Sequence, residues 1–173
     1  MMTPFGEPVQ LGESFVGDGA NAAHINTVLG RAGSGAETAW ATALATPRAG
    51  FAPFVTILQP GVPVKPFTLF VNKAAIEGDA HGNITWGAAQ AGVAAGVADA
   101  VAAGVIPQAE VDDLRIIAAV WVNPAANDEH AVYRNNREAT RTALVNGVER
   151  RPSTADVLAA LERPYNPFYA GER

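Results

Sequence analysis

Two glycine-rich turns near the N-terminus constrain the possible folds of this chain more than any other feature. Gly17-Asp18-Gly19 lies between strand-like runs at 12–16 and 22–30, and glycine supplies backbone angles in such a turn that other residues resist. Gly33-Ser34-Gly35 then precedes a helical pattern at 36–46, which Ser34 or the adjacent glycines would begin. The sequence therefore predicts two strands joined by a tight turn and followed by a helix.

The rest of the chain continues to alternate between strand and helix patterns. The clearest strand is 114–122, LRIIAAVWV, which is rich in β-branched residues and nearly continuous, so we expect it to be buried on both faces. We expect further strands at 54–58 and 68–76, a polar loop at 77–85, and helices at 86–104, at 128–146 and from Ser153.

The length of 173 residues suits one ordinary domain with a core of its own. No internal repeat or linker divides the sequence, so we expect a single domain over 1–173, with a C-terminal helix and tail from about 150. The tail, RPYNPFYAGER, carries three aromatic residues and two prolines. A tail of this kind is either disordered or docked on another surface, and its aromatic residues favour docking.

Composition excludes several classes of function. The absence of cysteine rules out disulfides, thiolate zinc sites and cysteine nucleophiles. A net charge of -5 without any cluster of Lys and Arg argues against nucleic-acid binding. The N-terminal sequence lacks a basic stretch followed by an apolar one, so we expect no secretion signal and a cytoplasmic location.

A long apolar run at 86–106 contains Gly92 and Gly96 at the spacing of small residues in membrane dimer helices. Gln90 and Asp99 interrupt this run, and alanine and glycine make up most of it. We therefore expect no membrane span, but a helix that lies close to a neighbouring backbone.

Common catalytic motifs are missing. Residues 30–35, GRAGSG, have neither the dinucleotide-binding spacing nor the Gly-Lys-Ser/Thr of a phosphate loop, and no GxSxG elbow occurs. The three histidines, His24, His81 and His130, lack the spacing of metal ligands, so we predict no metal site. We expect His81 and His130 at the surface. His24 lies in an apolar strand, where it is either structural or a proton-transfer group.

Several short motifs occur together and in order over roughly residues 10–145. They are Gly17-Asp18-Gly19, Ala23-His24-Ile25, Gly33 to Ala39, Pro63 to Lys73, Gly87 to Ala94, Gly104 to Pro107, Asp112 to Leu114 and Glu138 to Thr140. Each motif is weak alone, but the joint match resembles the formaldehyde-activating enzyme family. The part from about Arg150 onward resembles the family less clearly.

The resemblance implies a fold and an activity. The fold is α+β of the ribosomal protein S5 domain 2-like type, a mixed sheet packed against helices, assembled as a homopentamer. The activity is the condensation of formaldehyde with tetrahydromethanopterin, a co-substrate, to methylene-tetrahydromethanopterin and water, with no tightly bound cofactor. By this resemblance His24 is the general acid, and the pterin-contacting positions are Asn26, Val55, Lys73, Ala75 and Gln90.

The implied reaction suits these residue types. A pterin ring nitrogen attacks formaldehyde to give a carbinolamine, whose hydroxyl needs a proton to leave as water, and a second nitrogen closes on the resulting iminium. A histidine with an ordinary pKa of about 6.5 is a suitable proton donor near neutral pH. Lys73 could hold a polar pterin edge or an intermediate oxygen. Gln90 suits a lactam-like edge because its amide both donates and accepts.

Two positions depart from the family's pattern. Residues two apart share a strand face, so Asn26 lies beside His24, where the family has an aspartate, and an amide stabilises an imidazolium less than a carboxylate does. Ala75 stands where a threonine is usual and lacks its hydroxyl. We therefore predict a divergent paralogue. The alternative is a catalytically weakened homologue that binds a pterin or an aldehyde, and that acts on another carrier or in sensing.

Overall fold

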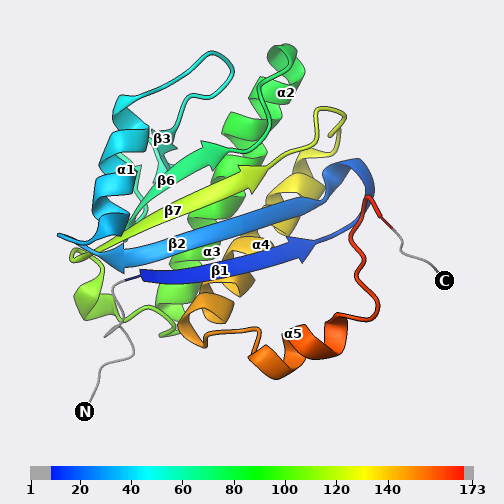
Figure 1. Ribbon diagram of the computed structural model, residues 1–173. Helices are drawn as coiled ribbons and strands as arrows, with labels where there is room; N and C mark the ends of the chain where they lie inside the picture. The colour runs from blue at the N-terminus through cyan, green and yellow to red at the C-terminus, as the bar shows by residue number, and fades with distance from the viewer. Residues whose placement is uncertain (1–8, 170–173) are drawn as a thin grey trace.

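A five-stranded sheet forms the centre of the computed structural model, which describes residues 9–169 (Figure 1). The strand order is β1-β2-β7-β6-β3. These strands are β1 (Val9–Val16), β2 (Ala23–Arg31), β3 (Phe54–Val55), β6 (Phe67–Asn72) and β7 (Leu114–Trp121). β6 and β7 run parallel and the other neighbours antiparallel, so the sheet is mixed. A separate ribbon pairs β4 (Ile57–Gln59) with β5 (Val62–Pro63).

The helices lie on both sides of this sheet. They are α1 (Gly35–Ala45), α2 (Gly78–Ile84), α3 (Gln90–Ala102), α4 (Glu129–Val148) and α5 (Thr154–Ala160). A π-helical segment, η2 (Thr85–Ala89), joins α2 to α3, and η1 (Gly19–Asn21) and η3 (Gln108–Glu110) are short 3-10 helices. α3 and α4 cover one face of the sheet (Figure 1). The predicted α+β class is confirmed, and the resemblance to the ribosomal protein S5 domain stays a prediction.

Alternating burial gives the sheet two unlike faces. Every second side chain of β2 and β7, including Ile25 and Val120, is buried in a core shared with α3 and α4. The side chains between them are only half-buried. The prediction that 114–122 is buried on both faces was therefore wrong, because α3 and α4 cover only one of them. His24 and Asn26 lie on the half-buried face.

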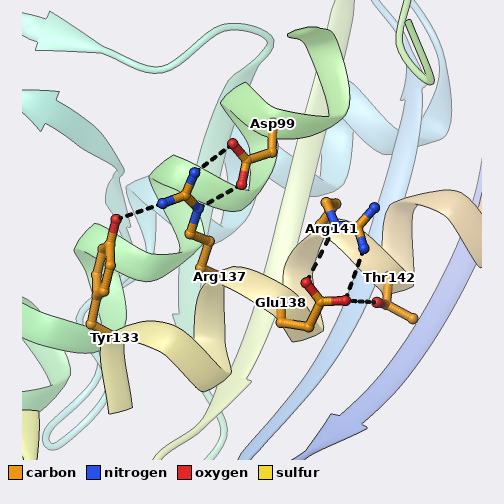
Figure 2. Close-up of polar contacts among 6 residues, drawn as sticks. All are labelled: Asp99, Tyr133, Arg137, Glu138, Arg141 and Thr142. Carbon is orange, nitrogen blue, oxygen red and sulfur yellow. Dashed lines mark hydrogen bonds and ion pairs between the residues drawn. The ribbon is translucent and has the colours of Figure 1, made fainter. Parts of the chain in front are cut away.

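α3 and α4 approach each other closely because α3 carries glycine at the contact. A Cβ atom on Gly92 would lie 2.5 Å from the carbonyl oxygen of Tyr133, and one on Gly96 would lie 2.5 Å from that of Arg137. Asp99 of α3 accepts two hydrogen bonds from the Arg137 guanidinium at the exposed edge of this contact (Figure 2). The predicted close backbone approach is confirmed. In the described part of the chain, no helix is both long and apolar enough to cross a membrane.

The structure of residues 77–85 differs from the polar loop that the sequence predicted. They form α2 and the start of η2 rather than a loop, and His81 is buried rather than at the surface, with 2% of its area exposed. The backbone N–H of Glu77 donates to His81 Nδ1 at 3.0 Å, which leaves the ring proton on Nε2, 3.0 Å from the carbonyl oxygen of Val122. Both ring nitrogens thus have hydrogen-bond partners, which offset the desolvation cost of burying this polar ring. His130 is exposed, as predicted.

Candidate active site

His24 contacts a carboxylate across the β1–β2 hairpin. In the antiparallel register Phe15 is opposite His24 and Glu13 is opposite Asn26, so Glu13 is a diagonal neighbour of the histidine on the same face. His24 Nε2 lies 3.0 Å from Glu13 Oε1. The rings of Phe15 and His24 lie 5.7 Å apart, between centroids. The hairpin therefore gives His24 a carboxylate partner on one side and an aromatic wall on the other.

Lys73 reaches the same histidine from the opposite direction. It directly follows β6, and its backbone N–H donates to Val120 of β7 at 2.8 Å. Its side chain extends across β7 to β2, where Nζ donates to Asn26 Oδ1 at 2.7 Å and lies 3.2 Å from His24 Nδ1. Ala119 is the β7 residue in register with Asn26, so a small side chain leaves room for this crossing.

These contacts order three polar groups in a row, Glu13–His24–Lys73. With Glu13 ionised, the Nε2 proton of a neutral His24 points to the carboxylate and the Nδ1 lone pair faces the Lys73 amine. Burial and the Lys73 charge lower the pKa of His24 from its ordinary value, while the charge and hydrogen bond of Glu13 oppose this. Burial also lowers the pKa of Lys73, again opposed by Glu13. A neutral imidazole between a carboxylate and a lysine is the arrangement that these directions favour.

An open cavity of about 690 Å³ lies over His24. Its lining combines the β1–β2 hairpin with the C-terminal tail, and the residues are Glu13, Phe15, His24, Tyr165, Asn166, Pro167 and Phe168. The ring of Phe168 meets that of Trp121 edge to face, with centroids 5.4 Å apart. The tail thus contacts the sheet at Phe168, but Tyr165, Phe168 and Tyr169 are still 80%, 75% and 55% exposed. Docking of the tail therefore stays a prediction, and its last four residues lie outside the described range.

The other predicted pterin contacts lie elsewhere on the chain. Val55 and Gln90 line a second cavity of about 400 Å³, together with Ala52, Pro53, Phe54, Ile57 and Trp86. The Gln90 side-chain oxygen accepts a hydrogen bond of 2.7 Å from the backbone of Ile57, so the amide contacts a neighbouring polar backbone. Ala75 is exposed in the segment after β6. The structure therefore brings His24, Asn26 and Lys73 together and separates them from Val55 and Gln90.

Glu13 is the site residue that sequence reasoning missed. The sequence contained a signal for it: a tight turn at 17–19 between two strands sets which residues of the hairpin are opposite each other, and so which residues are near His24. Among the described residues, no group of three or more His, Cys, Asp or Glu side chains could hold a metal ion.

Comparison with known proteins agrees with the motifs. The sequence model of the formaldehyde-activating enzyme (Fae) matches residues 11–169. The chain belongs to this family. Family membership confirms the resemblance and extends it through the C-terminal tail, beyond the motifs that carried it in the sequence. A 5,6,7,8-tetrahydromethanopterin hydro-lyase of Methanosarcina barkeri is 39% identical over 158 residues, which are 91% of this chain and 89% of that protein.

Longer members of the family also match. The bifunctional enzyme Fae/Hps of Archaeoglobus fulgidus is 34% identical over 159 residues, which are 92% of this chain and 40% of that enzyme. The bifunctional enzyme Fae/Hps of Methanosarcina mazei is 36% identical over 149 residues, or 86% of this chain and 38% of that enzyme. This chain is thus similar to one part of the bifunctional relatives.

Proposed function

We propose that the protein condenses formaldehyde with tetrahydromethanopterin to methylene-tetrahydromethanopterin and water, with His24 as the general acid. Family membership supports the reaction, since the relative from Methanosarcina barkeri is named a tetrahydromethanopterin hydro-lyase. The observation that supports the role of His24 most directly is its place between Glu13 and Lys73 at an open cavity. A divergent paralogue of this kind is a carbon–nitrogen lyase.

His24 has one step to perform in this reaction. A carbinolamine loses its hydroxyl as water only after a proton reaches the oxygen, and an imidazolium provides that proton. General acids of this kind contribute about 10²–10⁴-fold to a rate. Glu13 supports the step because its carboxylate stabilises the imidazolium form of His24.

Five positions are proposed to contact the pterin: Asn26, Val55, Lys73, Ala75 and Gln90. On the β6 side, Lys73 comes four residues after Leu69, the register partner of Val55, so Val55 and Lys73 are separated by about 13 Å along the strand direction. The contacts of one chain therefore form two groups. We propose a homopentamer in which one copy supplies the His24 cavity and a neighbour the second cavity. The S5-type fold, the single domain over 1–173 and the cytoplasmic location remain predictions.

The second candidate is a weakened homologue that binds a pterin or an aldehyde without turnover, on another carrier or in sensing. Asn26 and Ala75 favour it, because the first provides no charge beside His24 and the second no hydroxyl. The discriminating experiment measures the loss of formaldehyde with tetrahydromethanopterin and, separately, with tetrahydrofolate. A rate above the spontaneous one with tetrahydromethanopterin supports the proposed lyase. Binding by calorimetry without a rate increase supports the weakened homologue.

A further inference from the structure

We propose that Lys73 is a catalytic nucleophile that captures formaldehyde as a protonated imine before the methylene group passes to the pterin. The inference rests on the proposed function for its acceptor, but the capture itself needs only formaldehyde. It assigns to Lys73 a covalent role in place of a contact with the pterin edge.

The surroundings of the Lys73 amine make its neutral form more accessible than that of an ordinary lysine, because burial lowers its pKa although the Glu13 charge opposes this. A neutral amine has two N–H groups and one lone pair, and here two acceptors, Asn26 Oδ1 and His24 Nδ1, lie within hydrogen-bond reach of Nζ. When His24 is also neutral, both N–H groups are held and the lone pair takes the remaining direction. Neither acceptor carries a negative charge, since residue 26 is an amide and Glu13 contacts the far nitrogen of the imidazole. Half-burial of the side chain adds a desolvation cost to the ammonium form.

His24 can both activate Lys73 and remove the hydroxyl. Transfer of a proton from the ammonium to His24 Nδ1, 3.2 Å away, leaves a neutral amine and an imidazolium whose charge faces Glu13. Rotation about the Cε–Nζ bond then turns the amine lone pair from the new Nδ1–H toward formaldehyde, while Asn26 Oδ1 holds one N–H. The amine lone pair then bonds to the carbon of formaldehyde, and proton transfer gives the carbinolamine Lys73–NH–CH2–OH. Its hydroxyl lies two bonds from Nζ and thus near Nδ1, from which the proton returns as water leaves. Overall, an ammonium and formaldehyde give an iminium, Lys73–NH=CH2 with one positive charge, and water.

The methylene group leaves by the reverse chemistry. A secondary amine of the pterin attacks the iminium carbon in place of free formaldehyde, and the resulting aminal expels the Lys73 amine, which takes up a proton. The second pterin nitrogen then closes the methylene bridge and releases its own proton. No oxidant or reductant takes part. A lysine activated by desolvation next to another ionisable group is a known form of nucleophile.

The sequence offers an internal control for a trapping experiment, because Lys65 and Lys73 are its two lysines. Lys65 pairs with Asp112 at an exposed site. The protein is incubated briefly with limiting formaldehyde and cyanoborohydride in phosphate at pH 7, which converts an iminium to N-methyl-lysine. An ordinary lysine with a pKa of about 10.4 is neutral in only about 0.04% of molecules at this pH. Chymotryptic peptides cut at Phe67 or Phe70 separate the two lysines for mass spectrometry.

We expect Lys73 to be methylated at least ten times faster than Lys65. Equal or slower methylation of Lys73 would overturn the inference. In parallel, the rate with tetrahydromethanopterin is measured for the wild type, Lys73→Arg and the matched control Lys65→Arg. Arginine keeps the positive charge and donors but forms no such iminium. We expect Lys73→Arg to lose the rate increment and Lys65→Arg to keep it.

The remaining outcomes distinguish failure of formaldehyde capture at Lys73 from failure of the proposed condensation activity. Selective methylation of Lys73 together with full activity of Lys73→Arg would overturn its place in the reaction while the proposed function stands. Selective methylation without any wild-type rate increment would contradict the proposed function and support capture at Lys73 alone. Circular dichroism of both arginine variants confirms that they are folded.

Discussion

Single side chains decide whether His24 can act as an acid, and here the structure changes the account drawn from the sequence. Asn26 in place of an aspartate suggested that His24 had lost its carboxylate partner. The β1–β2 register brings Glu13 to His24 Nε2 instead, while Asn26 accepts from Lys73. The two residues therefore have different partners. Glu13 places a negative charge beside the imidazole of His24, and Asn26 holds the amine of Lys73 by a hydrogen bond.

Replacing Glu13 tests its effect on His24. Glu13→Gln removes the charge that raises the pKa of His24 and leaves burial and Lys73, both of which lower it. The pKa of His24 should therefore fall further, so a lower pH is needed to form the imidazolium and the rate increment at pH 7 should decrease. An NMR titration of the imidazole protons measures the shift, with exposed His130 as the internal control. An unchanged or raised pKa of His24 would contradict the role of Glu13.

Resemblance to the family located part of the site. His24, Asn26 and Lys73 were selected through the family's motifs, and the structure places Lys73 Nζ within hydrogen-bond distance of both His24 and Asn26. Glu13 was missed because an acidic residue on a strand is ordinarily solvated, and only the hairpin register shows what it faces. His81 was misplaced for a related reason: its burial depends on two backbone partners, Glu77 and Val122, which are distant from each other in the sequence.

Whole elements were easier to predict than their ends and surroundings. Nearly continuous runs of β-branched and apolar residues such as LRIIAAVWV predicted β7 within one residue. The predicted strand at 68–76 ends earlier, at Asn72, whose side chain donates to the carbonyls of Gly50 and Ala74 and so holds a turn. Contacts of this kind between distant segments have no local signature, and neither does the π-helical form of 85–89.

The α3–α4 contact gives a stability prediction with a matched control. Gly96→Ala places a methyl group against the Arg137 carbonyl and the Thr140 side chain, and such overpacking costs about 1–3 kcal/mol of unfolding free energy. Gly87→Ala adds the same methyl group in the same helical run where nothing lies within 4 Å, so no loss is expected. Urea unfolding measures both variants. Equal stability of the two would contradict the close packing of α3 against α4.

Several large apolar side chains are exposed on the surface of the single chain, where they pack against little else. Leu158 and Leu161 of the α5 region are 62% and 71% exposed, and Leu11 on the edge strand β1 is 68% exposed. The two groups of proposed pterin contacts also lie apart on one chain. Both features fit assembly with further copies. The sequence indicated assembly mainly through family resemblance, because surfaces between copies leave little periodic signal.

Light scattering tests the assembly directly. We expect a particle of about five times the chain mass of 17.9 kDa. A monomeric mass under conditions where the protein is active would contradict both the homopentamer and a site shared between copies.

The most direct test of the proposed acid is a rate comparison between the wild type and His24→Ala. Formaldehyde and tetrahydromethanopterin condense spontaneously, so the measured quantity is the increment in rate per enzyme at pH 7. We expect a clear increment for the wild type and its loss, by about 10²–10⁴-fold, when the acid is removed. The exposed-site variant His130→Ala should keep the increment. An absent wild-type increment, or one that survives in His24→Ala, would contradict the assignment of His24 as the general acid.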